Sequence, residues 1–217
     1  MTIRHPAKFS TPILNVLNEV IPDGLVLDPF AGTGRIHMLA RPGRSIVGVE
    51  IEPEWAGMRP GTIVGDALRL PFGDGTVDCV ATSPTYANRM ADHHDAKDGS
   101  KRLTYRHTLG RPLHTNNSGQ LQWGKKYRVF HRAAWAEADR VLGPSGVFVL
   151  NISDHIRKGK VIPVAEWHRD TIRGMGWTVC REIPVETDRM GFGANADVRV
   201  DFEMVYVFKR EDHPHPA

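Results

Sequence analysis

The stretch that decides the fold is residues 25–35, "LVLDPFAGTGR", in which a short apolar run ends on an acid and then turns through glycines. The apolar run predicts a buried strand, and Gly32 and Gly34 predict a tight turn into a helix. Glycines at such a turn let backbone N–H groups approach a ligand, and a helix N-terminus attracts negative charge. The stretch therefore predicts a strand, turn and helix unit with a ligand-binding edge.

Similar apolar runs recur along the chain, separated by segments with helical spacing or turn residues. Further strands are predicted at 45–50, 62–66, 77–83, 147–153, 177–185 and 201–210. Helices are predicted at 11–21, from the glycine turn to about 41–44, at 127–142 and at 163–175. Continuous apolar runs in the early strands imply burial on both faces, which is typical of parallel sheets. We therefore expect an α/β fold with a doubly wound, seven-stranded, mostly parallel sheet and an antiparallel last strand.

The length and composition fit one domain with one substantial core, since 41% of the 217 residues are hydrophobic. We expect that domain over residues 1–210, with a basic insertion at 87–130 and a disordered tail at 211–217. Cys79 and Cys180 lie in apolar runs, which predicts reduced core thiols. No stretch reaches the ~18 apolar residues that span a bilayer, and the N-terminus lacks an apolar signal region, so we expect a soluble cytoplasmic protein without a membrane partner.

The positive charge of the chain is concentrated in one segment. Residues 87–132 hold ten Lys or Arg against three Asp, a balance of +7, although the whole chain is only +3. The rest of the chain therefore carries −4. This asymmetry predicts a polyanionic partner, with a solvated basic loop as the alternative. Tyr105, Trp123 and Tyr127 interleave with the cations, which suits phosphate contact and base stacking.

Three acids follow three successive predicted strands. Asp28 ends the first strand, Glu50 ends the second 22 residues later, and Asp66 ends the third. Because the carboxyl ends of parallel strands share one edge of a sheet, the three acids are expected to converge on one crevice, although each alone can be a turn or cap residue. At this offset Glu50 can hold a ribose diol, and Asp66 can meet an adenine amine. A dinucleotide fits less well, because "GTGRIH" lacks a third glycine and Asp28 would repel a pyrophosphate.

These residues resemble a known family. The segments "DPFAGTG" (28–34), "VGVEIEP" (47–53) and "GDA" (65–67) resemble the cofactor-binding half of class I S-adenosylmethionine-dependent methyltransferases, which have a Rossmann-like fold. The segment "TSPTY" (82–86) resembles the Ser/Asp/Asn-Pro-Pro-Tyr/Phe signature of DNA amino-methyltransferases. The resemblance runs from "HPAKFS" (5–10) to the last strand, and implies that residues 1–210 form a single methyltransferase domain.

The resemblance implies S-adenosyl-L-methionine as the cofactor and methyl donor. Asp28, the turn from Phe30 to Gly34 and "HPAKFS" would contact its methionine part, Glu50 its ribose and Asp66 its adenine. The implied cofactor-binding residues are Lys8, Phe9, Ser10, Asp28, Pro29, Phe30, Ala31, Gly32, Gly34, Glu50, Ile51, Asp66 and Ala67. A restriction–modification system, or a phage or prophage genome, is the setting that the resemblance suggests.

The tetrad Ser83-Pro84-Thr85-Tyr86, at the end of the fourth predicted strand, is expected to carry the reaction. Methyl transfer to an exocyclic amine needs strict placement more than acid–base power, because conjugation withdraws the amino lone pair. Ser83 Oγ and the carbonyl of Pro84 can accept the two amine hydrogens, and Tyr86 offers a face to an extruded base. Ser83, Pro84 and Tyr86 are therefore the expected catalytic residues. Thr85 stands where the family usually has a second proline. Threonine at this position loosens the turn and adds a donor.

The basic segment and two later loops are expected to hold the nucleic acid. The loop "NISDHIRKGK" (151–160) resembles the base-pocket lining of the family, and "TDRMGFGANADVR" (187–199) lies where such folds contact substrate. The expected substrate-binding residues are Thr85, Arg89, Arg102, Arg106, Trp123, Asn151, Asp154, Arg157, Lys158, Arg189 and Asn195. Trp123 can instead anchor the insertion in the core. No metal is expected at "ADHHDA" (91–96), because adjacent histidines rarely bind one ion well and this chemistry needs none.

The prediction is thus a DNA methyltransferase that modifies an exocyclic amine. A serine at the first tetrad position favours cytosine N4 slightly, but the motif order also resembles several adenine N6 enzymes, so both bases stay open. One alternative is an RNA methyltransferase that modifies guanine N2 or adenine N6. The other is a non-catalytic nucleic-acid-binding protein with a vestigial cofactor cleft.

Overall fold

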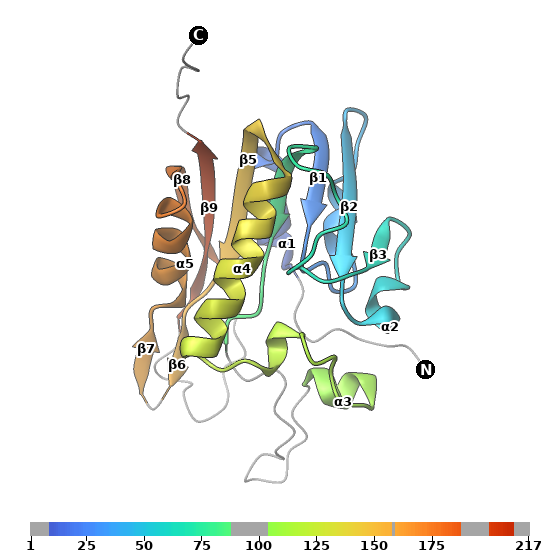
Figure 1. Ribbon diagram of the computed structural model, residues 1–217. Coiled ribbons are helices and arrows are strands. Elements are labelled where there is room, and N and C mark those ends of the chain that lie inside the picture. The colour runs from blue at the N-terminus through green and yellow to red at the C-terminus, as the bar shows by residue number, and fades with distance from the viewer. Residues whose placement is uncertain (1–8, 88–103, 158, 188–199, 211–217) are drawn as a thin grey trace.

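The computed structural model describes residues 9–87, 104–157, 159–187 and 200–210 (Figure 1). Seven strands form one sheet in the order β3-β2-β1-β4-β5-β9-β8, and β6 and β7 form a separate hairpin. The strands are β1 Gly24–Asp28, β2 Arg44–Glu50, β3 Thr62–Val64, β4 Val77–Thr82, β5 Leu142–Ile152, β6 His155–Arg157, β7 Lys160–Ile162, β8 Trp177–Glu186 and β9 Phe202–Arg210. The helices are α1 Thr11–Val20, α2 Pro53–Ala56, α3 Tyr105–Leu109, α4 Lys125–Val141 and α5 Val164–Arg173, with 3-10 helices η1 Arg35–Leu39 and η2 Ser118–Gln120.

The sheet has the predicted mixture of strand directions. Strands β3, β2, β1, β4 and β5 pair in parallel, whereas β9 runs antiparallel to both β5 and β8. The chain leaves β1 toward β2 and β3, and then returns to β4 on the other side of β1. The strand order therefore reverses between β1 and β4, and in such sheets ligands bind beyond the carboxyl ends of the strands at this reversal.

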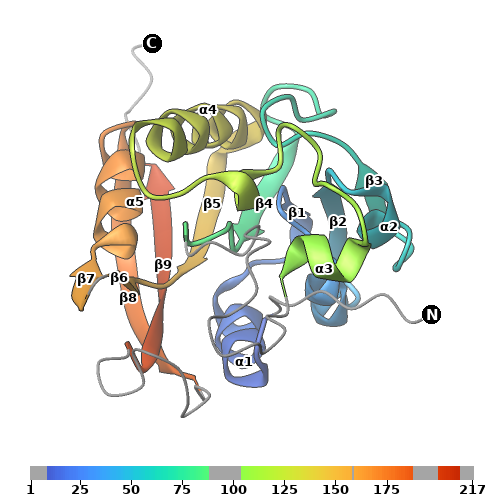
Figure 2. The same cartoon turned by 90° about the horizontal axis from the view of Figure 1, so that it is seen from below.

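Helices cover both faces of the sheet, as Figure 2 shows, with α4 and α5 on one face and α1 on the other. Neighbouring residues of β1 point to opposite faces, so Leu27 packs in the core that contains Trp135 of α4, and Val26 packs in the core that contains Leu17 of α1. Both β1 residues are fully buried. This two-sided burial explains why the early strands are continuous apolar runs. Within the described ranges, no helix is long and apolar enough to cross a bilayer.

Two sequence predictions need correction. The helix expected after the glycine turn is only the short η1, which ends at Leu39. Pro42 disfavours helical geometry at the residue before it, and β2 already begins at Arg44, so little chain is left for a longer helix. Cys180 is exposed rather than part of the core, because it lies on the edge strand β8, where the register shifts between Val179 and Arg181. Cys79 is buried, as expected.

Candidate functional site

Asp28 ends β1 at the start of the glycine turn, and its side chain is fully buried. Its Oδ1 accepts hydrogen bonds from the Phe30 amide at 3.0 Å and from Thr82 Oγ1, at the end of β4, at 2.6 Å. Its Oδ2 is buried and has no hydrogen-bond partner in the described part of the chain. Burial raises the pKa of Asp28 to about 7, against the lowering effect of these two bonds. The residue thus links the two strands at the reversal and leaves one acceptor oxygen for a ligand.

Glu50 ends β2 and holds the glycine turn in place. Its Oε2 accepts from the Gly32 amide at 2.8 Å, and its Oε1 accepts from the Glu52 amide at 2.9 Å. The turn needs its glycines, since Gly32 and Gly34 have positive φ angles of 54° and 69°. Burial raises the pKa of Glu50 to about 7. Two buried carboxyls, from Asp28 and Glu50, therefore flank one turn.

A pocket of about 450 Å³ lies beyond the ends of β2 and β3. Ile51 and Asp66, two of the predicted cofactor-binding residues, line it. The residues around it are Ile51, Glu52, Pro53, Val64, Gly65, Asp66, Arg111 and His114. The pocket thus combines an apolar wall with a carboxylate acceptor, as an adenosine moiety requires.

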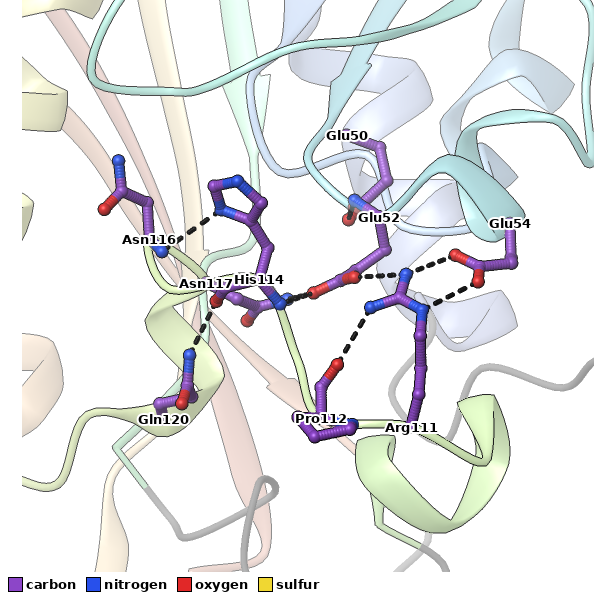
Figure 3. Close-up of polar contacts among 9 residues, drawn as sticks. All are labelled: Glu50, Glu52, Glu54, Arg111, Pro112, His114, Asn116, Asn117 and Gln120. Carbon is purple, nitrogen blue, oxygen red and sulfur yellow. Dashed lines mark hydrogen bonds and ion pairs between the residues drawn. The ribbon is translucent and has the colours of Figure 1, made fainter.

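A short segment, residues 111–118, lines this pocket through Arg111 and His114, and it is bound to Glu52 and Glu54 (Figure 3). Arg111 forms ion pairs with Glu52 at 2.7 Å and with Glu54 at 2.5 Å. The fully buried Glu52 also accepts at Oε1 from the His114 amide and from Asn117 Nδ2, both at 2.8 Å. These bonds fix the segment against the loop that follows β2. We call residues 111–118 the strap.

The strap also reaches the predicted adenine acceptor and the tetrad. Asn116 Nδ2 donates to Asp66 Oδ2 at 2.8 Å, and Thr85 Oγ1 donates to Ser118 Oγ at 2.9 Å. An amide NH2 group on Asp66 has the same donor chemistry as the exocyclic amine of adenine. One segment therefore contacts the pocket and the tetrad at the same time.

The tetrad directly follows β4, and its polar side chains meet residues from β5 and β9. Ser83 Oγ and Tyr86 Oη lie 2.8 Å apart. Asn151, at the end of β5, donates from Nδ2 to Ser83 Oγ at 3.2 Å, to Tyr86 Oη at 3.1 Å and to Glu203 of β9 at 2.8 Å. Tyr86 Oη donates to the same Glu203 oxygen at 2.9 Å. The structure therefore brings Ser83, Tyr86 and Asn151 together, and it adds Glu203, which the sequence analysis does not include.

Thr85 donates from its side-chain hydroxyl to Ser118, and its carbonyl is held as well. That carbonyl accepts from the Tyr127 hydroxyl at 2.7 Å, and the hydroxyl lies 2.8 Å from His168 Nε2. His168 Nδ1 in turn accepts from the Trp135 indole at 3.0 Å. Because Nδ1 is an acceptor, the His168 proton sits on Nε2 and donates to Tyr127. Burial keeps this histidine neutral by lowering its pKa well below the ordinary value. The turn without a second proline is thus held by a buried hydrogen-bond chain.

Replacing Tyr127 by phenylalanine tests whether this hydrogen-bond chain supports the turn. The variant leaves the Thr85 carbonyl and His168 Nε2 without their shared partner, so the free energy of unfolding should fall by about 1–3 kcal/mol. Urea unfolding of the two proteins measures the loss. Val129→Ala, at an exposed position of the same helix, is the matched control and should change stability little. A Tyr127→Phe protein as stable as the control would show that the chain does not support the turn.

Other predicted residues have mainly structural contacts. Asp154 Oδ1 accepts from the Ala165 amide at 2.8 Å and so caps α5. Trp123 packs against the core between Tyr127 and Trp167, which favours its role as an anchor.

Several predicted cofactor-binding residues also have packing or capping contacts. Phe30 packs beside Trp135, and Phe9 packs on the α1 side of the sheet. Ser10 caps α1, and Arg157 lies 3.3 Å from Gln122. Pro29, Ala31 and Ala67 lie in the turns beside the acids, and Arg106 lies on α3.

Part of the basic charge is used within the protein. Arg111 forms ion pairs with Glu52 and Glu54. The guanidinium groups of Arg128 and Arg132 lie over the rings of Trp123 and Trp167, respectively. Lys125 and Lys126 are exposed at the start of α4. Six predicted site residues lie outside the described residues: Lys8, Arg89, Arg102, Lys158, Arg189 and Asn195. The segment "ADHHDA" lies outside them too, and the described residues contain no group of three or more side chains suited to hold a metal ion.

Comparisons with known proteins bear mainly on the fold, and no family model matches the chain. A stretch of 69 residues is 36% identical to the type II methyltransferase M.ScaI of Streptomyces caespitosus, and covers 30% of this chain and 23% of that protein. An S-adenosylmethionine-dependent methyltransferase of Methanosarcina mazei superposes with a TM-score of 0.55 at 14% identity, over 90% of this chain and 96% of its own. The [4+2]-cyclase SpnF superposes with a TM-score of 0.56 at 14% identity, over 91% and 80% of the two chains.

This fold carries more than one chemistry, as the cyclase illustrates, so it does not define a reaction by itself. The chain spans less than a quarter of the length of its type II relative. The chain therefore has the Rossmann-like fold of class I S-adenosylmethionine-dependent methyltransferases, as the sheet order, the helix layers and these superpositions show together.

Proposed function

We propose that this protein transfers a methyl group from S-adenosylmethionine to an exocyclic amine of a base in DNA. One observation carries the proposal: the glycine turn and the tetrad flank the strand reversal, joined by the Thr82–Asp28 hydrogen bond of 2.6 Å. A cofactor on the turn and a base on the tetrad would therefore meet at one point.

The residues of the turn and pocket fit S-adenosylmethionine. Asp28 Oδ2 is buried without a partner among the described residues, and it suits a cationic group of the methionine part. Glu50, which holds the glycine turn, would accept from the ribose diol, and Ile51 and Asp66 line the pocket in which adenine would lie. S-adenosylmethionine, when bound, supplies an electrophilic methyl group on a positively charged sulfur. The role of the protein is to bind and orient the two reactants.

The tetrad fits an exocyclic amine. Ser83 Oγ and the carbonyl of Pro84 accept the two amine hydrogens and so direct the nitrogen lone pair at the methyl group. Asn151 Oδ1 is buried without a hydrogen-bond partner in the described ranges, which makes it a further acceptor for the base. Tyr86 provides an aromatic face on which an extruded base stacks. These acceptors support an exocyclic amine as the target.

DNA is favoured over RNA by two observations. The segment "TSPTY" resembles the signature of DNA amino-methyltransferases, and part of the chain is similar to a type II methyltransferase. The basic segment offers cations for phosphates, although Arg111, Arg128 and Arg132 are partly used within the protein. The choice between cytosine N4 and adenine N6 belongs to the experiment.

Single-nucleotide mapping of methylated bases in DNA from cells that express the protein tests the proposal. Modified cytosine or adenine in a fixed sequence context is expected, and Ser83→Ala should lose it, because the variant lacks the amine acceptor. Ser45→Ala, at an exposed position of β2, is the matched control and should keep the modification. Unmodified DNA from cells that contain the folded, cofactor-binding protein would contradict the DNA proposal, and methylated RNA from the same cells would support the RNA alternative.

A further inference from the structure

Four polar side chains meet where β4, β5 and β9 come together: Ser83, Tyr86, Asn151 and Glu203. Glu203 lies on β9 and is half-buried. One of its oxygens, Oε2, accepts from Tyr86 Oη at 2.9 Å and from Asn151 Nδ2 at 2.8 Å. Ser83, Tyr86 and Asn151 are neutral, so Glu203 brings a negative charge to the group. The network extends from the predicted amine acceptor to a carboxylate.

The proton count fixes the direction of these hydrogen bonds. A phenol has one proton, and Tyr86 donates it to the Glu203 carboxylate, which can only accept when ionised. The 2.8 Å contact between Ser83 and Tyr86 then requires Ser83 to donate and Tyr86 to accept. With its own proton directed at Tyr86, Ser83 Oγ faces other groups only as an acceptor. Ser83 Oγ can therefore accept a hydrogen bond from the target amine.

We propose that Glu203 is a positioning residue for methyl transfer and that it acts through Tyr86 and Ser83. This inference rests on the proposed function. It orients both hydroxyl protons so that Ser83 Oγ accepts from the target amine. It also takes up, through the same two hydroxyls, the proton that the amine loses.

The step balances in atoms and charge. The amine nitrogen forms a bond to the methyl carbon, the carbon–sulfur bond breaks with its electron pair going to sulfur, and the nitrogen gives up one proton. That proton goes to Ser83 Oγ as the Ser83 proton moves to Tyr86 Oη and the Tyr86 proton moves to Glu203 Oε2. Glu203 ends protonated and releases the proton to water. No metal or further reactant is required.

Glu203→Gln is the test, because glutamine keeps the size and an acceptor oxygen but is a much poorer base. The rate of a single turnover is measured on a DNA duplex that contains the site mapped in expressing cells, alongside the affinities for the duplex and for S-adenosylmethionine. The rate should fall by roughly 100-fold or more, while both affinities stay within about twofold. Tyr86→Phe, which keeps the ring but interrupts the proton path, should slow the step similarly, and the double variant should be little slower than either single one.

Glu186→Gln, at an exposed position of the adjacent strand β8, is the matched control and should match the wild type. A Glu203→Gln rate close to that of the wild type would overturn the inference and leave the proposed function intact. A loss of either affinity as large as the loss of rate would overturn it too, since Glu203 would then only support the structure. A wild-type protein that methylates neither DNA nor RNA would overturn the proposed function, and this inference with it.

Discussion

Replacing Glu50 by alanine should abolish S-adenosylmethionine binding while leaving the protein folded. Under the proposed function, the carboxylate accepts from the ribose diol, and in the structure it holds the Gly32 and Glu52 amides at 2.8 and 2.9 Å. Its removal deletes a ligand contact and frees the backbone of the turn that faces the ligand. Hydrogen bonds to a charged group contribute about 1.5–3 kcal/mol each, so a loss of roughly 100-fold or more in affinity is expected.

Isothermal titration calorimetry with S-adenosylmethionine measures this effect, and circular dichroism checks the fold. Glu19→Ala, on the exposed side of α1, is the matched control and should bind normally. Glu50→Gln should bind weakly, since it keeps one acceptor but loses the charge. Affinity retained within about threefold in Glu50→Ala would remove Glu50 from the cofactor site.

Replacing Asp28 by asparagine should change how stability depends on pH. The native pKa of Asp28 is raised by burial from 3.8 to about 7, so the folded protein holds a proton that the unfolded chain gives up near pH 4. The stabilisation from this proton is complete below about pH 4 and is lost as the pH rises through 7. Asparagine does not titrate, so between pH 4 and pH 8 the variant should gain up to roughly 4 kcal/mol relative to the wild type.

Urea unfolding of both proteins at several pH values between 4 and 8 measures this gain. The difference between the two curves is the relevant quantity, because buried His131 and His168 have lowered pKa values and act in the opposite sense in both proteins. The charge of Asp28 also raises the pKa of Glu50, so its removal adds to the same trend. Parallel curves would show that Asp28 is ionised in the native protein. Asp28→Asn should also weaken binding of a cationic ligand on the glycine turn.

The sheet and part of the site follow from local sequence patterns. Strands buried on both faces leave continuous apolar runs, and the acids that end β1 and β2 stand directly beside those runs in the sequence. Asp28, Glu50 and Ser83 are therefore assigned to one edge of the sheet by the sequence alone. The α4 helix was predicted within two residues at its start because its apolar side chains recur at helical spacing.

The remaining contacts depend on residues that are distant in the sequence. Glu203 lies 117 residues from Tyr86, and within β9 it is one acid in an apolar strand, so its role depends on the pairing of β9 with β5. The sequence indicates the strap only as part of a basic insertion. The partners of Arg111, Glu52 and Glu54, lie in the distant loop that follows β2. At Glu203, the available signal was a carboxylate that interrupts an apolar strand, but this signal does not identify the partner.

Under the proposed function, the strap bears on any attempt to change which DNA sequence the protein modifies. Recognition segments are natural targets for exchange between related enzymes, and the whole basic insertion, 87–130, would be the obvious unit to replace. Asn116 and Ser118 are only two positions apart, yet one binds the pocket and the other binds the tetrad. Grafting should therefore keep residues 104–130 from this protein and vary only residues 88–103. The same spacing means that a one-residue insertion between them should break at least one of these two contacts.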